Sequence, residues 1–202
     1  KSPSAGEILP GAAPKDIAAQ YERGGAACLS VLTDGPSFGG SLADFAAIRG
    51  AVSLPMLRKD FMIDTIQVAE ARAHGADAIL VILSCTDDAL AKDLVQAAHA
   101  LEMDALIETH DAAEVERALA LPSNLIGINN RDLKIMKTDL ATSEVLSHLI
   151  PEGVDFVSES GISDTGDIAR LRKTGARRFL IGESLMKRDD REAHVRALRA
   201  AR

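Results

Sequence analysis

The sequence predicts an α/β protein of the (β/α)8-barrel type whose first strand is missing from the chain as given. Short apolar runs of β type alternate with amphipathic helical segments, and a new run begins about every 25 residues. No glycine-rich dinucleotide fingerprint follows any of these runs, which disfavours a doubly wound sheet. Polar residues gather at the carboxyl ends of nearly all the runs, which is where a barrel builds its functional site.

Seven strands and eight helices account for most of the chain. The strands are predicted at 27–34, 54–61, 76–84, 104–110, 125–133, 154–162 and 177–186. The helices are predicted at 14–23, 41–49, 65–74, 87–101, 112–121, 143–149, 165–174 and 190–200. Gly24, Gly75 and Gly175 each stand between a helix and the next strand, where a left-handed helix end is favoured.

The apolar runs AILVIL and RRFLIG have no polar face, as expected for strands of a parallel sheet that helices cover. A closed barrel of this type needs eight strands. We therefore expect the missing strand to precede Lys1, and we expect residues 1–202 to form a single barrel domain without linkers.

Composition excludes several classes of partner. Lys and Arg total 23 against 30 Asp and Glu, so the formal net charge is −7 and a nucleic-acid partner is not expected. The longest apolar run, 78–83, is far shorter than the ~20 residues that cross a bilayer, so no membrane partner is expected. Cys28 and Cys85 lie in or beside strand-like runs, and we interpret them as buried thiols of a cytoplasmic protein.

Strand alternation predicts where the chemistry lies. If Leu57 points into the barrel, then Lys59 does too. The same alternation aims polar groups from three further strands at one mouth: Glu108, Asn129 with Arg131, and Glu159. A single polar residue at the end of a strand is equally well explained as a side chain that simply faces solvent. Together they favour a site, because buried charges are costly unless they serve one another.

Small residues end the last two strands, as Ser160–Gly161 and Gly182–Glu183–Ser184. In barrels the loops at this position commonly bind phosphate through backbone N–H groups, and Ser2 of the KSPS segment would lie beside them. Ordinary turn glycine is the alternative for each pair taken singly. His110 also reaches the mouth, although a simple hydrogen bond explains it better than a role in the reaction. No sequence motif indicates a metal site, a serine nucleophile or a cofactor.

The motifs at the strand ends resemble the indole-3-glycerol phosphate synthase family. The matching stretches are KSPS at 1–4, LSVLTD at 29–34, LPMLRKDF at 54–61, IETH at 107–110, IGINNRDL at 126–133, SESGI at 158–162 and IGESLM at 181–186. They occur in the family's order and spacing over essentially all 202 residues. The family also has a glutamate and a lysine on its first strand and a helical extension before it, and all of these would precede Lys1. If the polypeptide begins at Lys1, we expect little activity and a poorly closed barrel.

The resemblance implies a cofactor-independent carboxy-lyase of tryptophan biosynthesis. It converts 1-(o-carboxyphenylamino)-1-deoxyribulose 5-phosphate to indole-3-glycerol phosphate with loss of CO2 and water. It further implies that Lys59 is the general acid, that Glu108 moves protons, and that Asn129 and Arg131 position the substrate. The remaining implied contacts are to the ribulose, by Glu159 and Ser160, and to the phosphate, by Gly161, Gly182, Glu183 and Ser2.

Two other functions stay open from the sequence. A barrel like phosphoribosylanthranilate isomerase would need a Cys/Asp pair at the mouth in place of the Lys/Glu pair. A truncated barrel that binds phosphosugars without turnover, or that joins other tryptophan-pathway subunits, is the non-catalytic alternative.

Overall fold

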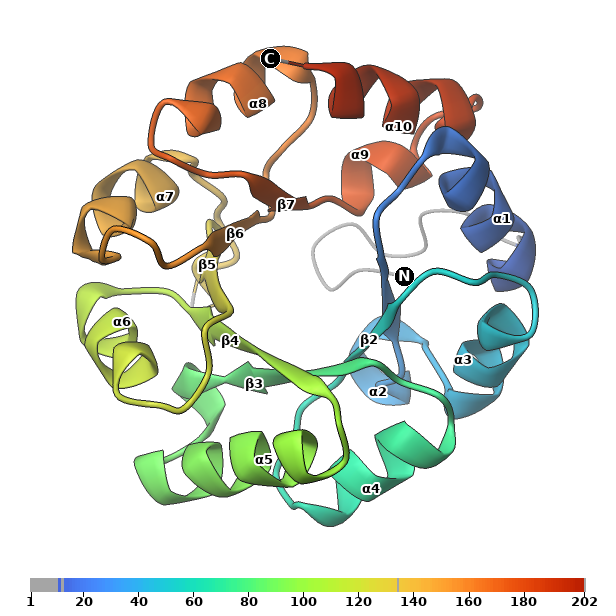
Figure 1. The fold of residues 1–202 in the computed structure, drawn as a ribbon. Helices are drawn as coiled ribbons and strands as arrows, with labels where there is room; N and C mark the ends of the chain where they lie inside the picture. Colours follow the sequence, from blue (N-terminus) through green and yellow to red (C-terminus); the bar gives the residue numbers. More distant parts are fainter. Residues whose placement is uncertain (1–10, 12, 134, 202) are drawn as a thin grey trace.

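The computed structural model describes residues 11, 13–133 and 135–201, and Figure 1 shows the fold along the axis of a ring of strands. Within these residues, seven parallel strands form one sheet in chain order. The strands are β1 (Leu29–Leu32), β2 (Met56–Lys59), β3 (Ala78–Ile82), β4 (Asp104–Thr109), β5 (Ile126–Asn129), β6 (Phe156–Glu159) and β7 (Arg178–Leu180). The sheet curls into a nearly closed barrel whose two edges are β1 and β7.

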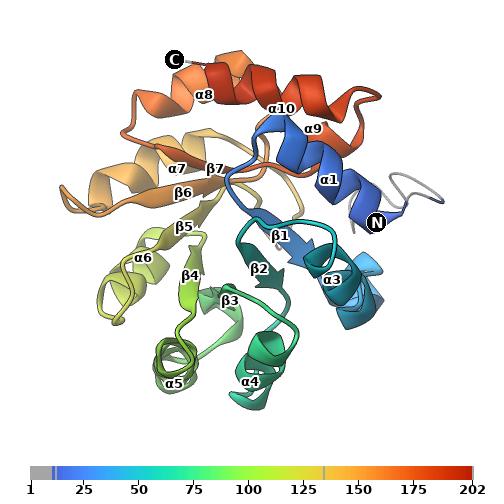
Figure 2. The ribbon, with the colours of Figure 1, turned by 45° about the vertical axis from the view of Figure 1, so that its right-hand side comes forward.

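Helices surround the strands, as Figures 1 and 2 show. The longer ones are α1 (Pro14–Gly24), α3 (Leu42–Arg49), α4 (Ile66–Ala73), α5 (Asp88–Ala100), α6 (Ala112–Leu119), α7 (Ala141–Leu146), α8 (Thr165–Arg172) and α10 (Arg191–Ala200). Four short helical turns complete the described chain: α2 (Gly35–Phe38), η1 (Leu83–Cys85), η2 (Ser147–Leu149) and α9 (Glu183–Met186). All seven strands and eight longer helices predicted from the sequence are present.

The ring of helices continues across the opening between β1 and β7. There α1 packs against α10, and Arg23 pairs with Glu192 at 2.9 Å. Gly24 makes this close approach possible, because a Cβ atom at that position would collide with Val195. The left-handed residue is the next one, Gly25, with φ 89°. The sequence prediction that Gly24 itself adopts the left-handed helix end is therefore wrong, and packing accounts for this glycine instead.

Two apolar clusters fill the protein, one on each side of the sheet. The larger lies between the strands and the helices, and it contains Ile79, Val81 and Ile107. The smaller lies inside the barrel, where Leu57, Leu106 and Val157 meet with others. Leu57 thus points inward as predicted, and the alternation of side chains carries the charged residues at the strand ends inward too.

Three local predictions need correction. The strands are shorter than predicted, and 177–186 divides into β7 and α9 because Gly182 ends the extended backbone. The short helix α2 was not predicted, although Asp34 caps it by accepting from the backbone N–H of Ser37 at 2.7 Å. Cys28 and Cys85 are exposed rather than buried, because both lie just outside a strand and not within it.

Candidate active site

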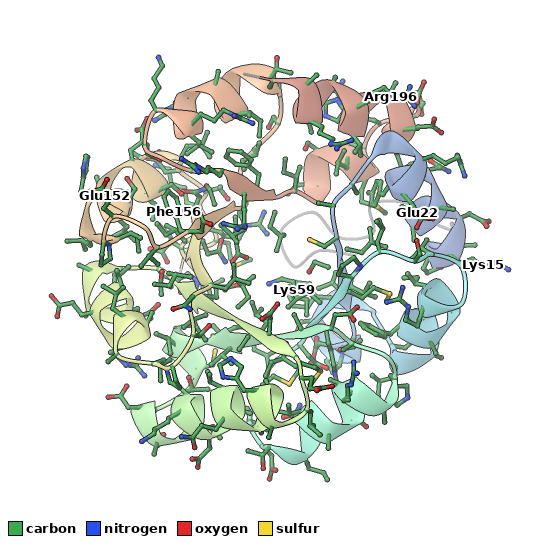
Figure 3. All side chains as sticks on the ribbon, in the orientation of Figure 1. Lys15, Glu22, Lys59, Glu152, Phe156 and Arg196 are labelled. Carbon is green, nitrogen blue, oxygen red and sulfur yellow. The ribbon has the colours of Figure 1, made fainter. Side chains whose placement is uncertain are left out.

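The carboxyl ends of the strands surround a cavity at one mouth of the barrel. Its lining includes the predicted residues Lys59, Glu108, Asn129, Arg131, Glu159 and Ser160. Figure 3 shows Lys59 near the middle of the ring, whereas Lys15, Glu152 and Arg196 lie on the outer rim. A larger, open hollow of about 570 Å³ lies at the opposite end, lined by Pro55, Asp77, His99, Glu102, Met103 and Asp104. No Lys or Arg lines that hollow, so the mouth is the candidate site for an anionic ligand.

Lys59 and Glu108 form the centre of the mouth. Lys59 Nζ lies 3.1 Å from Glu108 Oε2, and the amide of Asn129 donates to Glu108 Oε1 at 3.0 Å. These side chains come from β2, β4 and β5, so three strands must assemble before the cluster exists. The Glu108 side chain is 2% exposed and the Lys59 side chain 22%, which leaves the ammonium as the more accessible partner.

Burial and mutual charge give the two glutamates opposite proton states. Burial alone would raise the pKa of Glu108, but the Lys59 ammonium, the adjacent His110 ring and the hydrogen bond from Asn129 outweigh it and lower that pKa. Burial, reinforced by the negative charge of Glu108, raises the pKa of Glu159 to about 8. The pKa of Lys59 is lowered by burial, yet the charges of Glu108 and Glu159 outweigh this effect and raise it. At neutral pH the mouth therefore holds a protonated Lys59, an ionised Glu108 and a largely protonated Glu159.

Glu159 is fully buried, and its Oε1 has no hydrogen-bond partner among the described residues. A Cβ atom at position 127 would collide with this oxygen, so glycine in the neighbouring strand provides the space that the carboxyl occupies. An unsatisfied buried carboxyl oxygen is costly, and such atoms concentrate where a ligand or a reaction uses them.

Ser160 and Gly161 follow Glu159 with consecutive left-handed backbones, at φ 65° and 80°. Asn130 holds this turn, because its amide donates to the carbonyls of Glu159 and Ser160 at 2.9 and 3.1 Å. Its Oδ1 accepts from the backbone N–H of Ser143 at 3.0 Å, which ties the turn to α7. Asn130 was not predicted as a site residue, since its side chain points away from the mouth and its effect is exerted through the backbone.

Arg131 reaches the mouth from a loop and not from a strand, because β5 ends at Asn129. An isolated antiparallel bridge to Thr138 holds its backbone. Its guanidinium lies 3.1 Å from Glu183, whose other oxygen is 2.7 Å from Lys187. The expected inward direction of Arg131 holds, but its predicted place on a strand is wrong.

The predicted phosphate-binding residues lie side by side at the ends of β6 and β7. Gly161 lies two residues after β6, and Gly182 precedes α9, which begins at Glu183. A Cβ atom at position 182 would meet nothing within 4 Å, so open space adjoins this backbone. The hydroxyl of Ser184 is engaged, donating to the carbonyl of Ile162 at 2.8 Å. Ser2 lies outside the described residues.

Two phenylalanines at the mouth were not predicted as site residues. Phe38 of α2 and Phe61 just after β2 stack with ring centroids 6.3 Å apart, and both line the cavity. Phe61 follows Lys59 by two residues, so alternation offered a signal for it. For Phe38 the available signal was rarity, since the chain has only five phenylalanines and no Trp. Aromatic walls beside a cationic centre suit a ligand that is both aromatic and anionic.

The described residues show neither a metal site nor a membrane-spanning helix. In that part of the chain, no group of three or more His, Cys, Asp or Glu side chains is arranged to hold a metal ion. None of the described helices is both long and apolar enough to cross a membrane.

A parallel barrel with an ammonium, two carboxyls in opposite proton states and small residues at the last two strand ends defines a class: a barrel enzyme that performs acid–base chemistry on an anionic substrate. Comparison with known proteins makes this specific. The model of the family described as "Indole-3-glycerol phosphate synthase" matches residues 1–198.

Curated relatives agree with the family model. An indole-3-glycerol phosphate synthase of Hyphomonas neptunium is 68% identical over 187 residues, which cover 93% of this chain and 71% of that protein. Those of Azospirillum brasilense and Rhodospirillum rubrum are 48% and 50% identical, over 98% of this chain and 76% and 75% of their own lengths. The chain belongs to the indole-3-glycerol phosphate synthase family, carboxy-lyases of tryptophan biosynthesis that bind a phosphorylated substrate.

Proposed function

We propose that Lys59 is the general acid of indole ring closure and that Glu108 carries protons in the same reaction. The observation that carries this proposal is the 3.1 Å contact between Lys59 Nζ and Glu108 Oε2 inside the mouth. A raised pKa keeps Lys59 protonated, which is the state that can protonate the carbonyl oxygen of the ribulose chain. The ionised Glu108 holds the ammonium in place and is ready to accept a proton.

The substrate, 1-(o-carboxyphenylamino)-1-deoxyribulose 5-phosphate, has three recognisable parts. We assign its carboxylate to Arg131, since a guanidinium suits a planar carboxylate. The phosphate is assigned to the backbone N–H groups of Gly161, Gly182 and Glu183, together with Ser2. The stacked pair of Phe38 and Phe61 supports packing of the substrate's aromatic ring against these two side chains. Anchoring both ends would bring the ring carbon close to the carbonyl carbon.

Asn129, Glu159 and Ser160 complete the proposed site. Asn129 orients Glu108 through its amide, and Glu159 and Ser160 contact the ribulose hydroxyls. Decarboxylation after ring closure needs no base, because it returns electrons to the ring. In the dehydration that follows, the protonated Glu159 would give its proton to the departing hydroxyl while the ionised Glu108 would take one from carbon. The opposite proton states of the two glutamates support this division.

The direct test is to add the carboxyphenylamino ribulotide to the purified protein and follow indole fluorescence. We expect a fluorescence rise that depends on enzyme concentration. Turnover of the isomerase substrate with no turnover of the ribulotide would instead favour a barrel like phosphoribosylanthranilate isomerase. Neither Cys28 nor Cys85 lines the cavity, which does not support the Cys/Asp pair that such an isomerase would need. Binding of the ribulotide without turnover would support the non-catalytic alternative.

We also propose a cellular location and a set of partners for the protein. We place the chain in the cytoplasm, as a single catalytic domain that works beside other enzymes of tryptophan biosynthesis. Its two described cysteines are free thiols, which suits a reducing compartment. Co-purification of tagged protein from cells growing without tryptophan tests the association with pathway enzymes.

A further inference from the structure

We propose that His110 is a positioning residue for this reaction, a cation between two carboxylates that orients Glu108 and decides which of the two buried glutamates carries the proton. The inference rests on the roles proposed for Glu108 and Glu159. It goes beyond them by assigning His110 a part in the reaction, where the sequence indicated only a hydrogen bond.

The geometry places the imidazole between two acids. His110 Nδ1 lies 3.0 Å from Glu114 Oε2, and His110 Nε2 lies 3.2 Å from Glu108 Oε1. Both His110 and Glu114 have side chains that are 12% exposed, and the Glu108 side chain is 2% exposed. A neutral imidazole carries one N–H and can donate to only one of these oxygens, whereas an imidazolium can donate to both.

The start of α6 fixes this arrangement. Asp111 caps the helix by accepting from the backbone N–H of Glu114 at 2.9 Å. The Glu114 carboxylate turns back and accepts from the backbone N–H of His110 at 2.8 Å, through the oxygen that also faces the ring. The ring is therefore held on its outer side by a helix terminus, which leaves its inner nitrogen aimed at the catalytic carboxylate.

Charged groups from three elements interact with the ring: Glu108 on β4, Glu114 on α6 and Glu159 on β6. Burial lowers the pKa of His110, but hydrogen bonding and the charges of Glu108 and Glu114 outweigh it and raise that pKa to about 9. The imidazolium in turn helps to keep Glu108 ionised. Glu159 lies further from this cation, and it is the glutamate whose buried Oε1 lacks a partner in the described structure.

One detail distinguishes this contact from a purely structural one. His110 Nε2 is buried and close to Glu108, yet no well-aligned hydrogen bond to an acceptor forms among the described residues. Nδ1 is bonded to Glu114, so the ring is anchored. The Nε2–H group can therefore align with the Glu108 carboxylate when that carboxylate moves. Contacts of catalytic carboxylates are often loose in the empty site and tighten when substrate binds.

The test compares His110→Gln with His99→Gln, which alters an exposed histidine at the far end of the barrel. Glutamine retains a donor but cannot carry the charge. For His110→Gln we expect kcat to fall roughly tenfold with less than a twofold change in KM. The acidic limb of kcat/KM should also move to higher pH by about one unit, because Glu108 protonates more easily without the cation. His99→Gln should match the wild type in both measurements.

A merely structural role would lower thermal stability and leave the pH profile unchanged, and that result would overturn the proposal. If His110→Gln does not fold, Glu114→Gln provides the second variant. It retains an acceptor for His110 but removes one of the two carboxylates that raise the imidazole pKa, so by NMR the His110 ring should titrate at a lower pH than in the wild type, and an unchanged His110 titration would overturn the proposal.

NMR titration of the wild-type His110 ring checks the premise without any variant. We expect an imidazolium at pH 7 that titrates near 9. Titration near the ordinary value of 6.5 would overturn the proposal. Absence of turnover by the wild-type protein would instead count against the proposed function, and the NMR result would still stand, so the two failures are distinguishable.

Discussion

Arg58 and Lys59 are consecutive residues of β2, yet they lie in opposite kinds of ionic environment. Arg58 points outward, where its guanidinium contacts Asp60 at 3.0 Å and Glu70 at 2.8 Å and also bonds the carbonyl of Gln67. Lys59 points inward to Glu108, with Glu159 nearby. The fold thus places charges that stabilise the structure outside the barrel and charges suited to catalysis inside it.

The outer cluster is saturated with hydrogen bonds. Every nitrogen of the Arg58 guanidinium has an acceptor, and the Thr33 hydroxyl donates to the same Asp60 oxygen at 2.6 Å. Within the part of the chain that the structure describes, the inner cluster leaves Glu159 Oε1 and His110 Nε2 without aligned partners. The fully hydrogen-bonded charges of the outer cluster hold the loops after β1 and β2 in place. The buried polar atoms of the inner cluster that lack partners can gain hydrogen bonds when a substrate binds, which favours binding.

Lys59→Ala should have the largest effect, because it removes the cation of the inner cluster and leaves the outer cluster around Arg58 intact. We expect kcat to fall roughly 10²-fold or more with a modest change in KM, because a general acid is lost while the binding groups remain. Steady-state kinetics followed by indole fluorescence provide the measurement. Full activity in this variant would remove Lys59 from the mechanism.

Arg58→Met should show the reverse pattern. The substitution leaves Asp60 buried without its cation, so we expect the free energy of unfolding to fall by about 3 kcal/mol. Among the folded molecules kcat should change little. Urea titration combined with kinetics measures both quantities.

Glu70→Gln is the control for Arg58→Met, since the Glu70 side chain is 44% exposed and should cost less than about 1 kcal/mol. An Arg58→Met protein as stable as the wild type but as inactive as Lys59→Ala would break the comparison between the two clusters.

Arg131→Ala tests the substrate-binding part of the mouth. Loss of a charge-assisted contact to the substrate carboxylate should raise KM roughly tenfold and change kcat less. Thr138→Val removes only the hydroxyl that contacts the Arg131 guanidinium at 3.3 Å, so its effect on KM should be smaller. An unchanged KM in Arg131→Ala would contradict the anchoring role.

Glu159→Gln tests how the free energy of unfolding depends on pH. The folded pKa of Glu159 is raised from 4.5 to about 8, so the native state binds more protons than the unfolded state between these values. Wild-type stability from this group is therefore present at low pH and lost as the pH rises through that window. Relative to wild type, Glu159→Gln should gain stability as the pH rises from 5 to 8, by at most ~1.4 kcal/mol per pH unit.

Thermal unfolding at several pH values measures this difference. Titration of His110 occurs in both proteins, so it cancels to first order in the comparison. A constant difference between the two proteins across the pH range would show that Glu159 titrates normally in the folded state.

Strand alternation was enough to predict most of the mouth. Residues two apart on a strand share a face, so Leu57 in the barrel interior carries Lys59 inward, and Leu106 does the same for Glu108. The prediction failed where the chain leaves regular structure. Arg131 reaches the mouth through a loop bridge to Thr138, and Phe38 reaches it through α2, so neither position follows from a period of two.

Local periodicity and short motifs are enough to establish the alternation of strands and helices, the inward direction of the charged strand ends, and the family. The proton states of Glu108 and Glu159, the contact of His110 with two acids, and the exposure of both cysteines follow from the folded structure alone. Electrostatic interaction depends on distance and burial, and both are set by strands that lie far apart in the chain.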